Sequence, residues 1–454
     1  MVRVRFAPSP TGHLHVGNTR TALINYLFAR NQKGGFVLRI EDTDMERSDV
    51  LFEASILEDL QWLGIEWDEG PFRQSERLDI HLDYARILLE KGHAYKCFCT
   101  KEDLEKMRAA SAKKGEPPRY DGRCRSLSES SIKALEQEGR PYVVRFKSLE
   151  TPIGFVDGIH GRIDFPRDHV DDFIILKQEM TPSYNFAATV DDILMGITHV
   201  IRGADHISNT PKQIMLFQAF GKEPPRYAHH SLLTGADKKP LSKRHGVTSV
   251  RDFRAMGILP AALMNYVSIV GRSLKNDLLD KDGLIETFTL GSLSPSDALF
   301  DMEKLLWFNK EYIRKLAVED LLALLGLGPD YSEKVSLLRE NAQTIDDFKD
   351  LLKIFDSADI SEEAAGFLRD QKDAGKVIDE LRSICSQEGS PTFEAAFTHL
   401  ETVTGMKRRE IMLALRILLT GRKSGPPLGE IFPLIPKDII MKRLKCLAEE
   451  FFPG

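Results

Sequence analysis

Near the start of the chain, short continuous runs of apolar residues alternate with segments in which apolar residues recur at helical spacing. Residues 2–7 and 36–40 are short runs typical of buried strands, and the second leads into the acidic stretch 41–44. Each run is followed by apolar residues at helical spacing, first Leu23, Ile24, Leu27 and Phe28 and then Ile56, Leu57, Leu60 and Leu63. This alternation favours a parallel sheet covered on both faces by helices. We expect the sheet to resume at 184–190 and at 197–202.

The pattern changes twice further along the chain. The stretch from residue 95 to about residue 177 looks like an insertion between two halves of the sheet domain. It contains a Cys-Phe-Cys stretch, a charged helical segment and a strand-like run at 142–146. Residues 233–246 form a loop rich in Gly, Pro and Lys. Beyond it, helical periodicity marks 259–270, 316–325, 335–338 and 411–419. We therefore expect an all-helical C-terminal half.

Composition narrows the class of protein. The chain has 454 residues, of which 42% are hydrophobic and 29% charged, as in folded proteins of several domains. No apolar run approaches the roughly 18 residues of a membrane span, and we see no signal peptide, so we expect a cytoplasmic protein. Five Cys do not make a disulfide framework in a chain of this length. The formal charge of −6 argues against coating of nucleic acid, although local basic patches can still bind it.

The turn between the first strand and the first helix is the strongest candidate for chemistry. It carries Pro8, Pro10, His13, His15 and Gly17. A strand that turns into a helix N-terminus directs free backbone N–H groups and the positive end of the helix dipole at a ligand, which makes an anion site. Imidazole N–H groups at this turn could also reach a phosphate, although any one His here could equally be an ordinary capping residue.

The whole string has a more specific meaning. Phe-Ala-Pro-Ser-Pro-Thr-Gly followed by His-Leu-His-Val-Gly resembles the first signature of class I aminoacyl-tRNA synthetases, in its glutamyl form. Residues 15–18 stand where that family carries its "HIGH" tetrapeptide, with Asn18 in place of the final His. The resemblance implies that ATP is bound by Thr11, His13, His15, Gly17 and Asn18, together with a Lys from a later loop.

That later loop carries Ser242-Lys243-Arg244. Alone it would be a solvated basic turn, but with the first signature it resembles the class I "KMSKS" loop, with Pro240 in place of the usual first Lys. Attack of a carboxylate on the α-phosphate of ATP expels pyrophosphate, and mobile cations that close over the leaving group stabilise its charge. The resemblance implies this role for Lys243, and it makes His15, Ser242 and Arg244 the other catalytic residues.

A glutamate substrate has two carboxylates and one ammonium, so its pocket needs arginines and an acid. Arg5 and Arg202, each near the end of a predicted strand, and Glu41 meet that need, because a guanidinium binds a carboxylate bidentately and rejects the amide of glutamine. In the family that this chain resembles, the positions of Arg5, Ser9, Glu41, Tyr184 and Arg202 line the glutamate pocket.

Three cysteines in the insertion raise the question of zinc. Cys97, Cys99 and Cys124 supply three thiolates, while a structural zinc takes four ligands. Relatives that hold zinc place His where this chain has Ser126, whereas related truncated enzymes use a Tyr that corresponds to Tyr120. A zinc site and a set of reduced thiols on a vestigial site both remain open.

The resemblance covers essentially the whole chain. It implies an α/β Rossmann-like catalytic domain with a parallel sheet at 1–80 and 181–236, interrupted by an α+β acceptor-binding insertion at 81–180. It also implies a stem-contact domain at 237–315, which contains the Lys-containing loop. Two helical anticodon-binding domains are expected to follow, at 316–375 and 376–454.

The implied function is a glutamate–tRNA ligase that uses ATP and Mg²⁺ to form glutamyl-adenylate and transfers glutamate to tRNA(Glu). Asn341 falls where members selective for that tRNA often place Arg, so tRNA(Gln) is a further candidate substrate. We expect a monomer that does not bind membranes. Ala204 stands where the family more commonly has Glu. Together with Asn18 and Pro240, this departure from the family pattern suggests one alternative, a catalytically silent tRNA-binding paralog.

Overall fold

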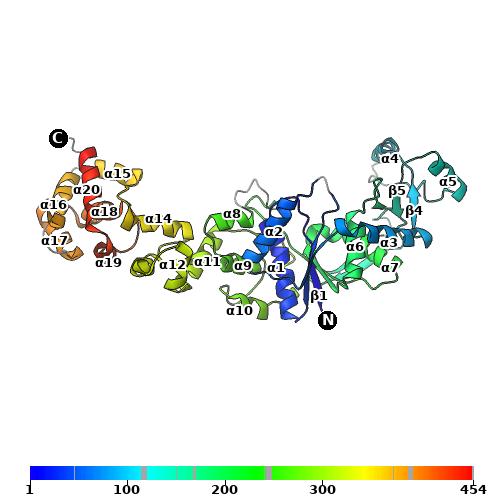
Figure 1. Cartoon of the computed structure of the whole chain (residues 1–454), viewed down its shortest axis with the longest axis horizontal. Helices are drawn as coiled ribbons and strands as arrows, with labels where there is room; N and C mark the ends of the chain where they lie inside the picture. Colours follow the sequence, from blue (N-terminus) through cyan, green and yellow to red (C-terminus); the bar gives the residue numbers. More distant parts are fainter. Residues whose placement is uncertain are drawn as a thin grey trace. The chain divides into compact units, whose positions relative to one another are not determined.

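The computed structural model divides the chain into two compact units, Met1–Phe253 with Met264–Asp301, and Arg254–Leu263 with Met302–Gly454. Figure 1 shows the elements of both in chain order. The residues that the structure describes are 1–44, 47–113, 120–149, 151–166, 170–239, 241, 248–371, 373–386 and 392–451.

Parallel strands form the centre of the first unit, as the apolar runs predict. One sheet has the order β1-β2-β3, and a second has the order β7-β6-β10-β9, in which β10 runs parallel to both neighbours and β7 is antiparallel to β6. The backbone N–H of Thr198, just before β9, donates to the carbonyl of Arg3 on β1 at 2.9 Å and so ties the two sheets together. The strands are β1 Arg3–Phe6, β2 Gly35–Ile40, β3 Glu69–Arg73, β6 Ile153–Asp157, β7 Gly161–Phe165, β9 His199–Gly203 and β10 Arg226–His230.

Helices pack around these strands. They are α1 Val16–Asn31, α2 Val50–Trp62, α3 Leu78–Glu90, α6 Tyr184–Leu194 and α7 Thr210–Ala219, and α10 Lys281–Glu286 packs on α1. The helices α8 Val250–Ala255 and α9 Pro260–Ile269 have residues in both units. A short pair of strands, β11 Leu233–Thr234 and β12 Ala298–Leu299, completes the first unit.

The expected return of the sheet at 184–190 is wrong, because Tyr184–Leu194 forms the helix α6. Residues 186–192 are buried on every side of the helix, so Phe186, Ala187, Ala188 and Val190 form an apolar run interrupted only by Thr189. A run of this kind cannot be distinguished from a buried strand by periodicity alone. The other predicted return is found as β9.

The insertion has a sheet of its own. Strands β4 Ala94–Cys97, β5 Val143–Phe146 and β8 Ile174–Leu176 pair in the order β4-β5-β8, with both pairs antiparallel. Two helices, α4 Lys101–Lys113 and α5 Glu129–Gln137, lie between β4 and β5 in the sequence.

Beyond residue 302, the secondary-structure elements in the described part of the second unit are all helices (Figure 1). The helices are α11 Met302–Lys315, α12 Val318–Leu325, α13 Ser332–Leu338, α14 Ile345–Asp356, α15 Glu362–Arg369, α16 Ala374–Ser386, α17 Phe393–Thr404, α18 Arg408–Thr420, α19 Leu428–Ile431 and α20 Lys437–Phe451. Their apolar faces share one core, as helical periodicity predicts.

One buried charge organises that core. The guanidinium of Arg443 on α20 donates to the carbonyls of Leu419 near the end of α18, of Ile354 near the end of α14 (2.9 Å), and of Ser357 beyond it. Helix ends leave carbonyls unpaired, and one guanidinium here satisfies two of them. In the part of the chain that the structure describes, no helix has the length and apolar character needed to cross a bilayer.

Candidate active site

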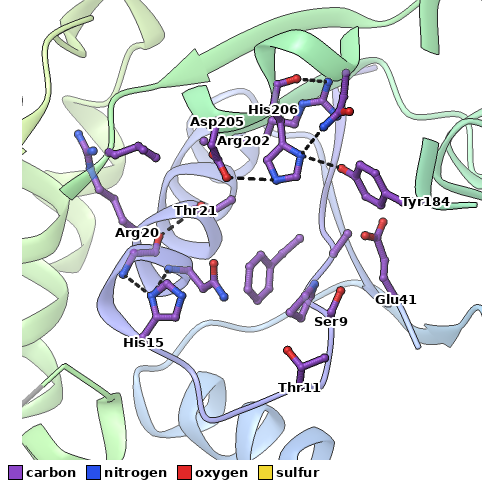
Figure 2. A pocket seen from close by; sticks show the side chains of 18 of the residues that line it. Ser9, Thr11, His15, Arg20, Thr21, Glu41, Tyr184, Arg202, Asp205 and His206 are labelled. Carbon is purple, nitrogen blue, oxygen red and sulfur yellow. Dashed lines mark hydrogen bonds and ion pairs between the residues drawn. The ribbon is translucent and has the colours of Figure 1, made fainter. Parts of the chain in front are cut away.

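A cavity of about 750 Å³ opens in the first unit at the carboxyl ends of β1, β2 and β9. Figure 2 shows that Ser9, Glu41 and Tyr184 lie toward one side of it and His15 and Thr21 toward the other. The crevice at the carboxyl ends of parallel strands is the usual ligand site of such a sheet. The predicted residues among its lining are Arg5, Ser9, Thr11, His15, Gly17, Asn18, Glu41, Tyr184 and Arg202.

His15 caps the first helix. Its Nδ1 accepts hydrogen bonds from the backbone N–H groups of Gly17 (3.1 Å) and Asn18 (3.4 Å). Burial lowers the pKa of His15, so at neutral pH the ring is neutral and carries its proton on Nε2. A Cβ on Gly17 would lie 3.0 Å from Cε1 and 3.1 Å from Nδ1 of His15. The glycine therefore makes room for the capping imidazole, which leaves an N–H donor at the helix N-terminus.

Two other predicted regions are not among the described residues that line the cavity. His13 is exposed, and its Nδ1 lies 2.9 Å from Ser55 Oγ on α2. The loop residues predicted to be catalytic, Ser242, Lys243 and Arg244, fall outside the described residues, although Leu241, which precedes them, lines the cavity. His13 and the loop remain predictions.

A buried ion-pair network lies behind one wall of the cavity. Oδ1 of Asp192, on α6, accepts from Nε of Arg5 at 3.2 Å and from Nη1 of Arg39 at 2.7 Å. The other terminal nitrogen of Arg39 donates to Glu41 Oε1 at 3.0 Å. Among the described residues Arg5 makes its side-chain hydrogen bond through Nε alone, so its terminal N–H groups are available to a ligand. Burial raises the pKa of Glu41, although Arg39 and Arg5 oppose that shift.

The second arginine is held differently. Nε of Arg202 donates to Nε2 of His229 at 3.1 Å, and Nη2 donates to Thr210 Oγ1 at 2.9 Å. Nη1 is buried and finds no hydrogen-bond partner within the described ranges. A buried donor without a partner costs free energy of folding, and such a donor is typical of an atom that forms a hydrogen bond with a bound ligand.

Neutral polar groups line the space beside Arg202. Figure 2 shows the hydroxyl of Tyr184 directed at His206, and Asp205 on the other side of the same imidazole. Burial, followed by the charge of Arg202, lowers the pKa of His206 to about 4, so this ring is neutral at pH 7. Burial raises the pKa of Tyr184, which keeps its phenol protonated.

The cysteines of the insertion converge on a second, separate site. Sγ of Cys99 lies 3.6 Å from Sγ of Cys124, and the hydroxyl of Tyr120 lies 3.2 Å from Sγ of Cys97 and 3.8 Å from Sγ of Cys99. The three sulfur atoms lie within 4.8 Å of one another.

Sequence reasoning missed Asp192 and His229, which hold the two arginines, and Arg39 and Asp157, which pair with Asp192 and His229. One signal was available, because Arg39 interrupts the apolar run 36–40, and a charge inside a buried run calls for a buried partner.

Comparison with known families agrees with this fold. The family described as "tRNA synthetases class I (E and Q), catalytic domain" matches residues 1–307, and "Anticodon binding domain" matches residues 300–448. The chain therefore belongs to the class I tRNA synthetases of the glutamate and glutamine type.

Individual relatives narrow the family. The glutamate–tRNA ligase of Aquifex aeolicus is 43% identical over 99% of both chains, and that of Bacillus subtilis is 41% identical over 98% of this chain and 99% of its own. A crystal structure of a glutamate–tRNA ligase from Elizabethkingia meningosepticum in complex with its amino acid has a TM-score of 0.84 at 32% identity, over 99% of each chain. This chain is a member of the glutamate–tRNA ligase family.

Proposed function

We propose that the cavity binds glutamate and ATP, forms glutamyl-adenylate and transfers glutamate to the 3′ end of tRNA(Glu). The observation that carries this proposal is the pair of buried arginines, each anchored by Nε. Both terminal nitrogens of Arg5 and the Nη1 of Arg202 are available to a ligand. Two guanidinium groups on one cavity match a substrate that has two carboxylates.

Glu41 supplies the complementary charge for the substrate ammonium. Because burial raises the pKa of Glu41, an arriving cation would stabilise its ionised form. Ser9 and the phenol of Tyr184 add neutral hydrogen-bonding groups on the same side of the cavity (Figure 2). Glutamine fits this arrangement poorly, since its NH2 group would face guanidinium donors.

ATP occupies the side of the cavity at the N-terminus of α1. His15, Thr11 and Asn18 line that side, and the helix N-terminus together with Nε2–H of His15 suits a polyphosphate. Class I synthetases use ATP with Mg²⁺, and the negative charge that develops on pyrophosphate is then stabilised by the cations of the 242–244 loop. Catalysis of this kind depends on positioning and charge neutralisation, without an acid or base from the chain.

The test is attachment of labelled glutamate to purified tRNA(Glu) and, separately, to tRNA(Gln). Charging of tRNA(Glu) alone would indicate a discriminating enzyme. Charging of both would support the role of Asn341, an exposed residue just after α13, and would require an amidotransferase to process the glutamyl-tRNA(Gln). Charging of neither, with tRNA still bound, would favour the silent paralog. A monomeric state in the cytoplasm stays a prediction.

A zinc site in the insertion is a second part of the proposal. In a tetrahedral zinc site with metal–sulfur bonds of about 2.3 Å, neighbouring sulfurs lie about 3.8 Å apart. The 3.6 Å between Cys99 and Cys124 and the 3.2 Å and 3.8 Å contacts of Tyr120 are of that order, so these donors and Cys97 fit one ion. Zinc here would cross-link β4 to the segment 120–124 and would have no part in the chemistry.

Metal analysis of the purified chain decides between zinc and free thiols. About one equivalent of zinc that is lost in the Cys124→Ser variant would support the site. Less than about a tenth of an equivalent would leave three reduced thiols. Cys446 on the exposed face of α20 provides the matched control, because Cys446→Ser should leave the zinc content unchanged.

A further inference from the structure

Three neighbouring strands place a row of polar side chains at their carboxyl ends. Asp157 ends β6, His229 lies on β10, and Arg202 lies on β9. The parallel register pairs Tyr227 with Asp157 and His229 with Arg202, so the row crosses the sheet from β6 to β9. Asp157 and His229 are buried and do not line the cavity, whereas Arg202 does.

Asp157 fixes which nitrogen of His229 carries the proton. Oδ2 of Asp157 lies 2.6 Å from Nδ1 and 3.1 Å from the backbone N–H of His229, while Oδ1 accepts from the backbone N–H groups of Ile159 (2.9 Å) and His160 (3.0 Å). Burial acts to raise the pKa of Asp157, but these hydrogen bonds outweigh it and hold the pKa at about 2. An ionised carboxylate can only accept, so the ring proton of His229 is on Nδ1 and Nε2 is free to accept from Arg202.

The imidazole of His229 stays neutral in this setting. Its ring stacks on Tyr227 at 6.2 Å between centroids and packs against Phe155 at 6.1 Å. Burial and the charge of Arg202 lower the pKa of His229, although Asp157 acts in the opposite direction. A neutral acceptor therefore holds the guanidinium of Arg202 at Nε.

The two arginines of the cavity consequently differ in whether a carboxylate of the protein compensates their positive charge. Arg5 is paired with the carboxylate of Asp192, which Arg39 shares. Arg202 forms no ion pair with any described residue, and its partners are the imidazole of His229, the hydroxyl of Thr210 and, at 3.5 Å, the carbonyl of His206, all of them neutral. Its positive charge is thus left for the ligand, and a carboxylate gains more from that charge than an amide does.

We propose that Asp157 and His229 are positioning residues that aim Arg202 and preserve its uncompensated charge, so that they set the preference for the side-chain carboxylate of glutamate over the amide of glutamine. This inference rests on the proposed function, which places glutamate in the cavity.

Asp157→Asn is the sharpest test because it keeps the shape of the side chain. The NH2 group is most unfavourable in place of Oδ1, which faces the backbone donors of Ile159 and His160, so it would take the place of Oδ2, which among backbone donors faces only the N–H of His229. There it donates to Nδ1 of His229, which moves the ring proton to Nε2 and turns it against the Nε–H of Arg202. We expect KM for glutamate to rise roughly tenfold to hundredfold, KM for ATP to stay within about twofold, and the ratio of kcat/KM for glutamate over glutamine to fall in parallel.

Two further variants keep the test decisive. Asp164→Asn makes the same change on the adjacent strand β7, where Asp164 is exposed and pairs with Arg162, and it should leave KM for glutamate unchanged. His229→Asn can keep a donor to Asp157 while it removes the acceptor of Arg202, so it should raise KM for glutamate even if Asp157→Asn does not fold.

Arg202→Ala separates failure of this inference from failure of the proposed function. If Arg202→Ala raises KM for glutamate and adding Asp157→Asn raises it little further, the two residues act as one unit. If Arg202→Ala raises KM but Asp157→Asn and His229→Asn match Asp164→Asn, or if the effects multiply, the positioning role is overturned. If Arg202→Ala itself leaves KM unchanged, the assignment of the glutamate pocket is wrong.

Discussion

Asp192→Asn should destabilise the first unit strongly, because this carboxylate is the centre of the buried ion-pair network. Asp192 is 3% exposed, and it accepts from Arg5 at 3.2 Å and from Arg39 at 2.7 Å. Arg39 is fully buried, so after the substitution Glu41 is its only described carboxylate partner. Removing one partner of a buried pair costs about 3–5 kcal/mol. The amide oxygen can still accept one hydrogen bond, so we expect the low end, about 3 kcal/mol.

The assay has to report on the first unit alone, because a chain with two compact units need not unfold in one step. Trp62 and Trp67 lie in the first unit, and Trp307 lies in the second. In a Trp307→Phe background, tryptophan fluorescence during urea unfolding therefore follows the first unit. The free energy of unfolding is read from the midpoint and slope of that transition.

A matched control uses an exposed carboxylate on the same unit. Asp83 is 64% exposed and pairs with Arg86 one helical turn away, so Asp83→Asn should change the free energy of unfolding by less than about 0.5 kcal/mol. If Asp192→Asn shifted stability by no more than this control, the ion-pair network would not be what holds Arg5 and Glu41 in place.

Three further predictions rest on single contacts. Gly17→Ala should displace the capping imidazole of His15, cost about 1 kcal/mol of stability and raise KM for ATP. Gly12→Ala is the control, because a Cβ at Gly12 meets open space, and it should change neither stability nor KM for ATP. Equal KM values for ATP in the two variants would contradict this prediction. Arg443→Met should leave helix-end carbonyls unpaired and destabilise the second unit by about 3 kcal/mol in urea unfolding, with the exposed Lys442→Met as control. The pKa of Asp157 is about 2 in the folded chain and about 3.9 when unfolded, so its contribution to stability is present above pH 4 and is lost as pH falls. The stability gap between wild type and Asp157→Asn should therefore shrink by about 1 kcal/mol from pH 5 to pH 3, and a constant gap would refute the low pKa.

The sequence predicted those parts of the fold that local patterns determine. Strands β1 and β2 and the helices α12, α13 and α18 of the second unit lie close to the predicted ranges, because short apolar runs and helical spacing mark them directly. Helix α6 was missed because its apolar residues are buried on every side. The turn before α1 was located correctly, but the pattern gave no sign that the role of Gly17 is to accommodate the ring of His15.

The contact of Asp157 and His229 with each other, which positions Arg202, could not be predicted, because it depends on the order of the strands in the sheet. Asp157 and His229 are 72 residues apart in the chain and meet only because β6 pairs with β10. No local pattern encodes that pairing. Arg5 and Arg202 were identified from the chemistry of the substrate and from family resemblance, but the reason for their different charge environments is visible only in the structure.

The central claim is that the cavity activates glutamate with ATP, and exchange of labelled pyrophosphate into ATP tests it most directly. We expect exchange that requires both glutamate and tRNA(Glu), is weak with glutamine, and falls by at least about a hundredfold in Lys243→Ala. Tight tRNA binding with no glutamate-dependent exchange would contradict the account and leave a tRNA-binding protein without catalytic activity.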